Sequence, residues 1–249
     1  MVTGVFLLAS GASALNQVQE RDLDAHMERT CRRPLPTGRI ALLHGLVVSI
    51  ALASIGLLLL LHAGGRTAAL LGLFTLLWYN AVYTGLKRIT AFAAVPGALV
   101  GAIPPAIGWV SAGGAVTDPR LLALCFIFFM WQVPHFWLLI LRHGKEYEKA
   151  GIPSLTRLMN RNQIARTTFA WIVAATFATF ALPLYGSVRS PLAFFSFIPP
   201  ALWLIWKGRS LTGINRLQTA APLLFRTMNL YLFIMMSLLS LESIFSRMP

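Results

Sequence analysis

Apolar residues gather in long stretches along this chain, separated by short polar segments. Eight of these stretches approach or reach the roughly 17–25 residues that an α-helix needs to cross a lipid bilayer. They cover residues 1–15, 41–61, 67–86, 91–112, 119–141, 167–187, 190–206 and 228–245. The pattern predicts an all-α polytopic membrane protein with about eight transmembrane helices in a single domain over residues 1–249.

Composition agrees with a membrane protein: the 249 residues are 57% hydrophobic and 12% charged. A soluble domain is usually about 45–50% apolar and about 25% charged. A net charge of +13 would suit a protein that binds nucleic acid. However, the predicted spans place 17 of the 21 Lys and Arg on one side of the membrane and four on the other. The positive-inside rule makes the rich side cytoplasmic, so we expect no nucleic-acid partner.

The same orientation places Met1 on the far side of the membrane, ahead of a first span with no basic residue before it. Such a span inserts awkwardly, so we expect an upstream helix that this sequence lacks, or a miscalled start. Cys31 and Cys125 form no CxxC pattern and are interpreted as ordinary residues.

A charged run, LNQVQERDLDAHMERTCRRPLPTGRI (15–40), separates the first two apolar stretches and holds four of the chain's eight acids. Asn16, Glu20 and Asp24 recur every four residues, so a continuing helix stacks them on one face, whereas Asp22 lies on another. Such a cluster of oxygen ligands suits Mg²⁺, which takes one or two carboxylates together with substrate phosphates. The alternative is a solvated loop whose charges only set the topology.

Other charged residues on the same side would complete a diphosphate site. Arg29 and Arg33 could donate to phosphate oxygens. After the span 119–141, a second loop carries Glu146 and Glu148 among basic residues. Two acidic loops are what a metal-bridged diphosphate needs. Lys87 could neutralise the leaving group, as could its neighbour in YTGLKRIT, but both could equally be positive-inside anchors.

Three blocks of sequence resemble a known family. They are the charged run (15–40), YTGLKRITAFAAVPGALVGAIPPAIGW (83–109) and WQVPHFWLLILRHGKEYEKAGIPSL (131–155). In order and spacing they are similar to the haem-farnesylating family (protohaem IX farnesyltransferases, or haem O synthases) within the UbiA superfamily of intramembrane prenyltransferases. The resemblance implies a bundle of nine helices around a central cavity, the first of them missing here.

The resemblance also implies an activity. A farnesyl group would pass from farnesyl diphosphate to a vinyl group of haem b, giving the hydroxyethylfarnesyl side chain of haem O, with Mg²⁺ as cofactor. The setting it implies is the bacterial inner membrane, with the site on the cytoplasmic side. A haem A synthase or cytochrome oxidase assembly factors would be partners in the bilayer.

Family roles fall on matching positions of this sequence. The resemblance implies a catalytic set, metal ligands within it, diphosphate contacts and haem contacts. The catalytic set is Asn16, Glu20, Asp22, Asp24 and Glu146, of which Glu20, Asp24 and Glu146 would bind the metal. The diphosphate contacts are Arg29, Arg33, Lys87, Arg88 and Lys145. The haem contacts are His135 and Tyr147. Two departures stand out: Glu146 replaces the usual Asp, and Ser-Leu-Thr (154–156) replaces Met-Leu-Pro.

Alternatives stay open at this point. A UbiA-type enzyme could prenylate a quinone or chlorophyll precursor instead. The departures from the family pattern would also suit a non-catalytic remnant that only binds haem. A transporter would need ionisable residues within the spans, where Glu242 is the only acid that stands out. His135 could simply hydrogen-bond a neighbouring helix.

Overall fold

The computed structural model describes residues 1–188, 190–212 and 217–245, without the side chains of 142, 145 and 217–219. The chain forms two compact units. The first comprises Met1–Val116 and Lys145–Ser154, and the second comprises Thr117–Gly144 and Leu155–Pro249. All regular elements of the described residues are helical, as the apolar pattern predicts. The expectation of a single domain stays a prediction.

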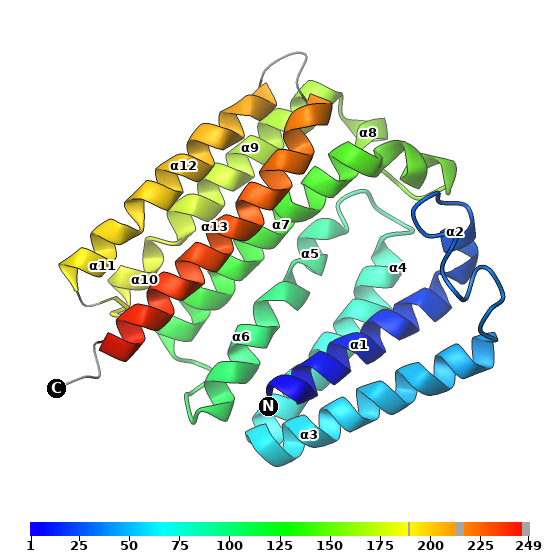
Figure 1. The fold of residues 1–249 in the computed structure, drawn as a ribbon, viewed down its shortest axis with the longest axis horizontal. Coiled ribbons are helices and arrows are strands. Elements are labelled where there is room, and N and C mark those ends of the chain that lie inside the picture. Colours follow the sequence, from blue (N-terminus) through cyan, green and yellow to red (C-terminus); the bar gives the residue numbers. More distant parts are fainter. Residues whose placement is uncertain (189, 213–216, 246–249) are drawn as a thin grey trace. The chain divides into compact units, whose positions relative to one another are not determined.

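The first unit is built around a long helical hairpin. Its elements are α1 (Val2–Gln19), α2 (Arg21–Ala25), α3 (Leu42–Leu77), the π-helix η1 (Trp78–Tyr83), α4 (Thr84–Leu86), α5 (Ala94–Gly97), α6 (Leu99–Ser111) and the end of α7 (Figure 1). Within α3, Gly65 has φ of 80°, a left-handed conformation that glycine adopts without steric cost. The predicted spans 41–61 and 67–86 are therefore the two arms of one element that bends at Gly65.

Small residues let α1 approach α3 closely. A Cβ atom on Gly11 would come within 2.5 Å of the backbone nitrogen of Ala53, and one on Gly56 equally close to that of Leu8. Leu60 is fully buried in the same interface. In a membrane, lipid tails are as apolar as the side chains, so helices associate through such close packing. This contact holds α1 in place along the first arm of α3.

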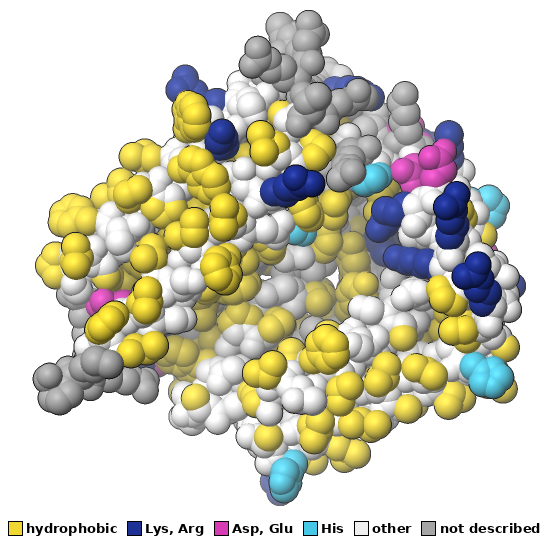
Figure 2. Space-filling model, in the orientation of Figure 1, with side chains coloured by type: hydrophobic (Ala, Val, Ile, Leu, Met, Phe, Trp, Pro, Cys, Tyr) yellow, Lys and Arg dark blue, Asp and Glu magenta, His cyan; other side chains and the backbone are white. Residues whose placement is uncertain are grey.

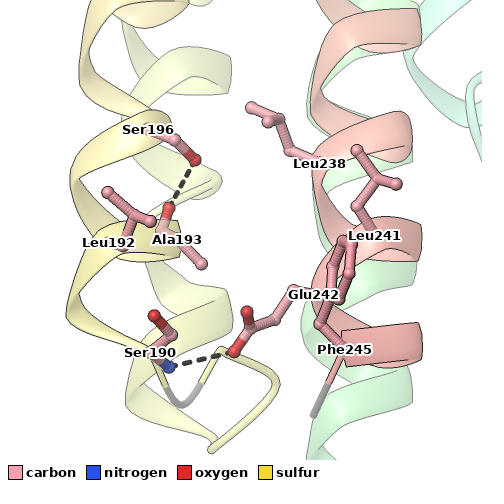
Figure 3. A pocket seen from close by; sticks show the side chains of 8 residues that line it. All are labelled: Ser190, Leu192, Ala193, Ser196, Leu238, Leu241, Glu242 and Phe245. Carbon is pink, nitrogen blue, oxygen red and sulfur yellow. Dashed lines mark hydrogen bonds between the residues drawn. The ribbon is translucent and has the colours of Figure 1, made fainter. Parts of the chain in front are cut away.

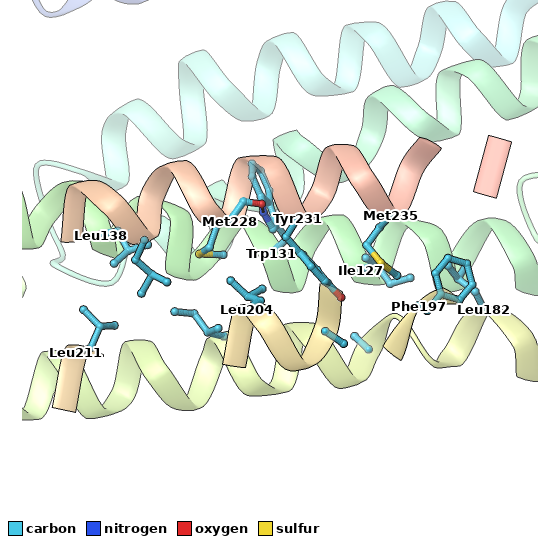
Figure 4. Close-up of a cluster of buried hydrophobic side chains, with 14 of the residues drawn as sticks. Ile127, Trp131, Leu138, Leu182, Phe197, Leu204, Leu211, Met228, Tyr231 and Met235 are labelled. Atoms are coloured by element: carbon cyan, nitrogen blue, oxygen red, sulfur yellow. Dashed lines mark hydrogen bonds between the residues drawn. The ribbon is translucent and has the colours of Figure 1, made fainter. Parts of the chain in front are cut away.

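The second unit packs long helices around a separate apolar core. Its elements are α7 (Pro119–Lys149, up to Gly144), α8 (Leu155–Leu158), α9 (Arg161–Ala178), α10 (Ala181–Leu184), α11 (Pro191–Ser196), α12 (Ile198–Gly208), η2 (Arg209–Thr212) and α13 (Leu217–Phe245). Leu204, Met228 and Phe197 are fully buried in this core (Figure 4). The Trp131 indole donates to the Met228 carbonyl at 3.0 Å, which satisfies the one polar atom of that ring.

Five helices of the described residues are long and apolar enough to cross a membrane. They are Leu42–Leu86, Ala94–Ser111, Pro119–Leu141, Arg161–Leu184 and Ala220–Phe245, and they cover six of the eight predicted stretches. The stretch 1–15 forms α1, which ends in polar residues, and 190–206 is divided between α11 and α12 around Phe197. The chain is thus an integral membrane protein with several transmembrane helices, whereas the number eight stays a prediction.

Candidate functional site

The first charged run begins in the last turn of α1 and continues into α2. The amide of Glu20 donates to the carbonyl of Asn16 at 2.9 Å, and the amide of Asp24 donates to that of Glu20 at 2.7 Å. The four-residue step therefore continues from α1 into α2, although the backbone deviates from helical geometry at Glu20. Asn16, Glu20 and Asp24 are all buried, with 8%, 7% and 1% of their surface exposed. Asp22 is exposed, consistent with its expected place on another face.

Both buried carboxylates face a cation. The ammonium of Lys87 lies 2.7 Å from Glu20 Oε1 and donates a hydrogen bond to Oε2 at 2.9 Å. Glu20 Oε1 is itself buried, and within the described part of the chain its contact with Lys87 is an ion pair without hydrogen-bond geometry. Arg33 Nη1 donates to Asp24 Oδ2 at 2.7 Å. Burying a carboxylate is costly unless it is paired, so Lys87 and Arg33 offset the cost of burying Glu20 and Asp24.

The second acidic motif reaches the first one. Gly151 ends α7 in a left-handed conformation, and the amide of Ile152 donates to the carbonyl of Tyr147 at 2.9 Å, as in a Schellman motif. This ending fixes the last turn, where Glu146 Oε2 accepts a hydrogen bond from the Arg29 amide at 3.3 Å. The sequence pattern predicted a loop at Glu146, whereas α7 continues through Lys149. The first charged run and this helix end, more than 100 residues apart in sequence, therefore meet within the first unit.

Tyr147 also belongs to this contact. Burial raises the pKa of its hydroxyl. The charge of Arg29 and a hydrogen bond from its side chain act against that rise, while the carboxylate of Glu20 adds to it. The structure therefore places Tyr147, expected from the resemblance to contact haem, beside the acidic cluster. Its hydroxyl stays protonated near neutral pH and can donate a hydrogen bond.

A row of polar contacts joins α1 to the π-helix and α4. Asn16 Nδ2 donates to Thr84 Oγ1 at 3.1 Å, and Arg88 Nη2 donates to the carbonyl of Gln19 at 2.8 Å. Asn80 Nδ2 donates to the carbonyl of Ala12 at 3.0 Å. The sequence pattern predicts no role for Gln19, Asn80 or Thr84. The polar side chains of Asn80 and Thr84 inside an apolar span are the feature of the sequence that could have indicated such a role.

Other predicted residues lie elsewhere. The side chain of Lys145 lies outside the described residues. His135 belongs to the second unit, where its ring lies 4.6 Å from that of Trp131 and 4.4 Å from that of Phe225, centroid to centroid. Its Nδ1 is buried, and no hydrogen-bond partner for it lies among the described residues. The contact with haem stays a prediction.

Glu242 does not resemble a transport residue. It lines a pocket of about 630 Å³ in the second unit, between α11 and the end of α13 (Figure 3). Its Oε1 accepts a hydrogen bond at 2.9 Å from the amide of Ser190, the residue before α11. The carboxylate thus satisfies a backbone donor at a helix start, which is a structural task.

The described residues suit Mg²⁺ only if waters and substrate phosphates supply most of its ligands. Among the described residues, no three His, Cys, Asp or Glu side chains gather closely enough to hold a metal ion. Mg²⁺ usually binds through one or two carboxylates, with waters and substrate phosphates completing its shell. Glu20 and Asp24 supply that number of carboxylates, and both are buried, but each already pairs with a cation, so Mg²⁺ would compete with Lys87 and Arg33 for their oxygens. Glu146 accepts from a backbone amide instead, so its role as a ligand stays a prediction.

The surface around this site is basic. In Figure 2, Lys and Arg side chains gather over α2 and its neighbouring loop, while hydrophobic side chains cover most of α3. Arg29 is an exposed member of the basic group, and Lys87 is partly buried. The exposed apolar side chains of α3 suit contact with lipid, and the basic end suits the membrane surface.

Comparison with known proteins identifies the family. The sequence matches the UbiA prenyltransferase family over residues 1–233. The chain belongs to this family. Among its UbiA relatives, it is 45% identical over 223 residues to the protoheme IX farnesyltransferase of Geobacter sulfurreducens, covering 89% of this chain and 82% of that one.

Solved structures agree on the UbiA fold. A digeranylgeranylglyceryl phosphate synthase matches with a TM-score of 0.73 and 16% identity, covering 97% of this chain and 84% of that one. A UbiA homologue from Archaeoglobus fulgidus, bound to GPP and Mg²⁺, matches with a TM-score of 0.64 and 13% identity, covering 96% and 89%. At these identities the likeness establishes the fold alone.

Proposed function

We propose that this UbiA-family protein is a protohaem IX farnesyltransferase, which transfers the farnesyl group of farnesyl diphosphate to a vinyl group of haem b and so forms haem O. The similarity to the Geobacter sulfurreducens enzyme supports the acceptor. The observation that carries the proposal is the meeting of two acidic motifs with a basic end in one unit, through the hydrogen bond between Arg29 and Glu146.

The diphosphate binds at the acidic end of α1. Glu20 and Asp24 hold Mg²⁺, which when bound neutralises diphosphate charge and makes it a better leaving group. Lys87, Arg88 and Arg33 lie within reach of the same oxygens, since each already contacts α1, α2 or their junction. Arg29 extends this basic set on its exposed side. Such fixed donors stabilise the negative charge that develops on the departing group.

The chemistry then proceeds by ionisation. The bond between farnesyl C1 and the diphosphate oxygen breaks, and the electron pair leaves with the diphosphate. A vinyl carbon of haem b attacks C1 with its π electrons. Water adds to the cation left on the adjacent carbon and loses a proton, which completes the hydroxyethylfarnesyl group. Apolar walls delay that water until the new carbon–carbon bond has formed.

The proposed setting follows from the charge distribution and the family. The site lies at the cytoplasmic face of a bacterial inner membrane, where the Lys and Arg residues gather. His135 contacts haem in the second unit, and its unpaired Nδ1 supports that assignment. A haem A synthase or cytochrome oxidase assembly factors receive the product.

Acceptor competition tests the proposal against its nearest alternative. Purified protein is given farnesyl diphosphate and Mg²⁺, with equal concentrations of haem b and a quinone precursor such as 4-hydroxybenzoate. Products are separated by chromatography and identified by mass. Farnesylation of haem b alone supports the proposal. Prenylation of the aromatic acid, or of neither acceptor, would overturn it.

A further inference from the structure

A buried amide inside the membrane span is the least expected feature of the first unit. Asn80 has 6% of its surface exposed and lies in the π-helix η1, within the apolar sequence LLWYNAVYT. Its neighbours in that span are mostly apolar, so the amide needs partners to offset its desolvation. Those partners all come from α1, the helix that carries Asn16 and leads to Glu20.

The amide of Asn80 reaches two levels of α1. Its Nδ2 donates to the carbonyl of Ala12 at 3.0 Å and to Gln19 Oε1 at 3.1 Å. Gln19 Nε2 in turn donates to the carbonyl of Asn80 at 3.1 Å. One side chain is therefore tied to α1 almost two helical turns apart, and Gln19 closes the ring. Sliding or rotating either helix would break all three hydrogen bonds together.

The π-helix gives this residue its direction. The amide and the hydroxyl of Thr84 both donate to the carbonyl of Tyr79, five residues earlier, which is the wide turn of a π-helix. Such turns are frequent at functional sites. With this turn in place, Asn80 and Thr84 both face α1, and Lys87 and Arg88 follow on the same side.

We infer that Asn80, with Gln19, is a positioning residue that sets the register between α1 and η1, and thereby the separation of Glu20 from Lys87. This inference rests on the proposed function, because it assigns the role through the diphosphate site. Asn80 contacts neither carboxylate: it acts through α1. Its removal frees the acid and its cation to shift relative to one another.

A matched control exists in the same span. Thr75 is another polar residue of this span, half-buried rather than buried, and its hydroxyl donates at 2.7 Å to the carbonyl of Leu71 on its own helix. Thr75→Ala therefore removes a hydrogen bond without altering the contact with α1. A second probe is Gln19→Met, which keeps side-chain length and leaves the backbone carbonyl that Arg88 contacts.

The test measures affinity for farnesyl diphosphate in the presence of Mg²⁺, without haem, and kcat for haem farnesylation, both per folded protein. Misplacement by about 1 Å can cost roughly 100-fold in rate, so we expect Asn80→Ala to lower kcat by about tenfold or more. In the same variant, the Mg²⁺ concentration needed for half-maximal binding of farnesyl diphosphate should rise. If Asn80 had a purely structural role, its removal would lower the yield of folded protein but leave kcat and the Mg²⁺ requirement of the folded fraction unchanged.

The outcomes separate the inference from the proposed function. If wild-type protein does not bind farnesyl diphosphate, the proposed function fails. If it binds, and Asn80→Ala matches Thr75→Ala in affinity, Mg²⁺ requirement and kcat, the positioning role is wrong. If Asn80→Ala is not recovered folded, Gln19→Met carries the same comparison. Loss in Asn80→Ala or Gln19→Met, with Thr75→Ala unchanged, supports the inference.

Discussion

The ammonium of Lys87 lies 2.7 Å from the Glu20 carboxylate, although 67 residues separate the two in sequence. Their side chains are only 18% and 9% exposed, so the pair is largely withdrawn from water. The contact joins the first charged run to the end of the span Leu42–Leu86. Under the proposed function, it holds the acid that would bind Mg²⁺ against a base that would bind diphosphate before either ligand arrives.

Breaking this pair should separate stability from activity. Glu20→Gln leaves the Lys87 charge without its partner, and we expect a loss of about 3 kcal/mol, at the lower end for buried pairs because Lys87 keeps some exposure. The double variant Glu20→Gln with Lys87→Met removes both charges, so most of that stability should return. Activity should stay lost in both proteins. Thermal unfolding in detergent together with the farnesylation assay measures the two effects, and a double variant with restored activity would contradict the account.

Asp24 should matter far more than a nearby exposed acid. We expect Asp24→Asn to lower kcat about 100-fold or more, because it removes a carboxylate proposed to hold the Mg²⁺ that neutralises the departing diphosphate. Glu28→Gln is the control, since this acid lies four residues along in the same loop but is exposed. It should retain wild-type activity. Equal losses in the two variants would mean that the loop acts through its overall charge.

The close packing of α1 on α3 gives a prediction about stability alone. A methyl group at Gly56 would meet the backbone of Leu8 at 2.5 Å, whereas one at Gly108 would meet nothing within 4 Å. Gly56→Ala should destabilise the protein by about 1–3 kcal/mol, the usual cost of overpacking. Gly108→Ala should be neutral, or stabilising by up to about 1 kcal/mol, because alanine favours helix. The melting temperatures of the two variants, measured in the same detergent, test this prediction. Similar melting temperatures would contradict the close packing of α1 on α3.

Tyr147 should make stability depend on alkaline pH. Burial raises the pKa of its hydroxyl, so the folded protein holds this proton more tightly than the unfolded chain does. Its contribution is fully present below the ordinary tyrosine pKa of about 10 and is lost as pH rises through the higher folded value. The melting temperature of wild type should therefore fall more steeply than that of Tyr147→Phe above about pH 10. Parallel slopes for the two proteins would show that the hydroxyl is not held in this way.

Local spacing was enough to predict part of the site. Asn16, Glu20 and Asp24 recur with the period of a helix, and the backbone hydrogen bonds keep that period across the break at Glu20. The apolar stretches likewise predicted the helical class and most of the span positions, because length in a bilayer is a local property.

Other parts depend on contacts that no local pattern records. The pairing of Lys87 with Glu20 and of Arg29 with Glu146 requires the folded arrangement of distant segments. Asn80 was overlooked because one amide hardly changes the mean hydropathy of its span, and a π-helix leaves no signature in a 3.6-residue period. The apolar pattern also predicts 41–61 and 67–86 as separate spans, whereas the structure has them as one element with a bend at Gly65.

The most direct test is conversion of haem b to haem O by membranes that contain this chain. Farnesyl diphosphate and haem b are supplied with Mg²⁺ or with a chelator, and the extracted haems are separated by chromatography and identified by mass. If the protein farnesylates haem b with Mg²⁺, we expect haem O from the wild-type protein with Mg²⁺, and none with the chelator or from Asp24→Asn. Wild-type membranes that make no haem O, or that make it equally well with Asp24→Asn, would contradict it.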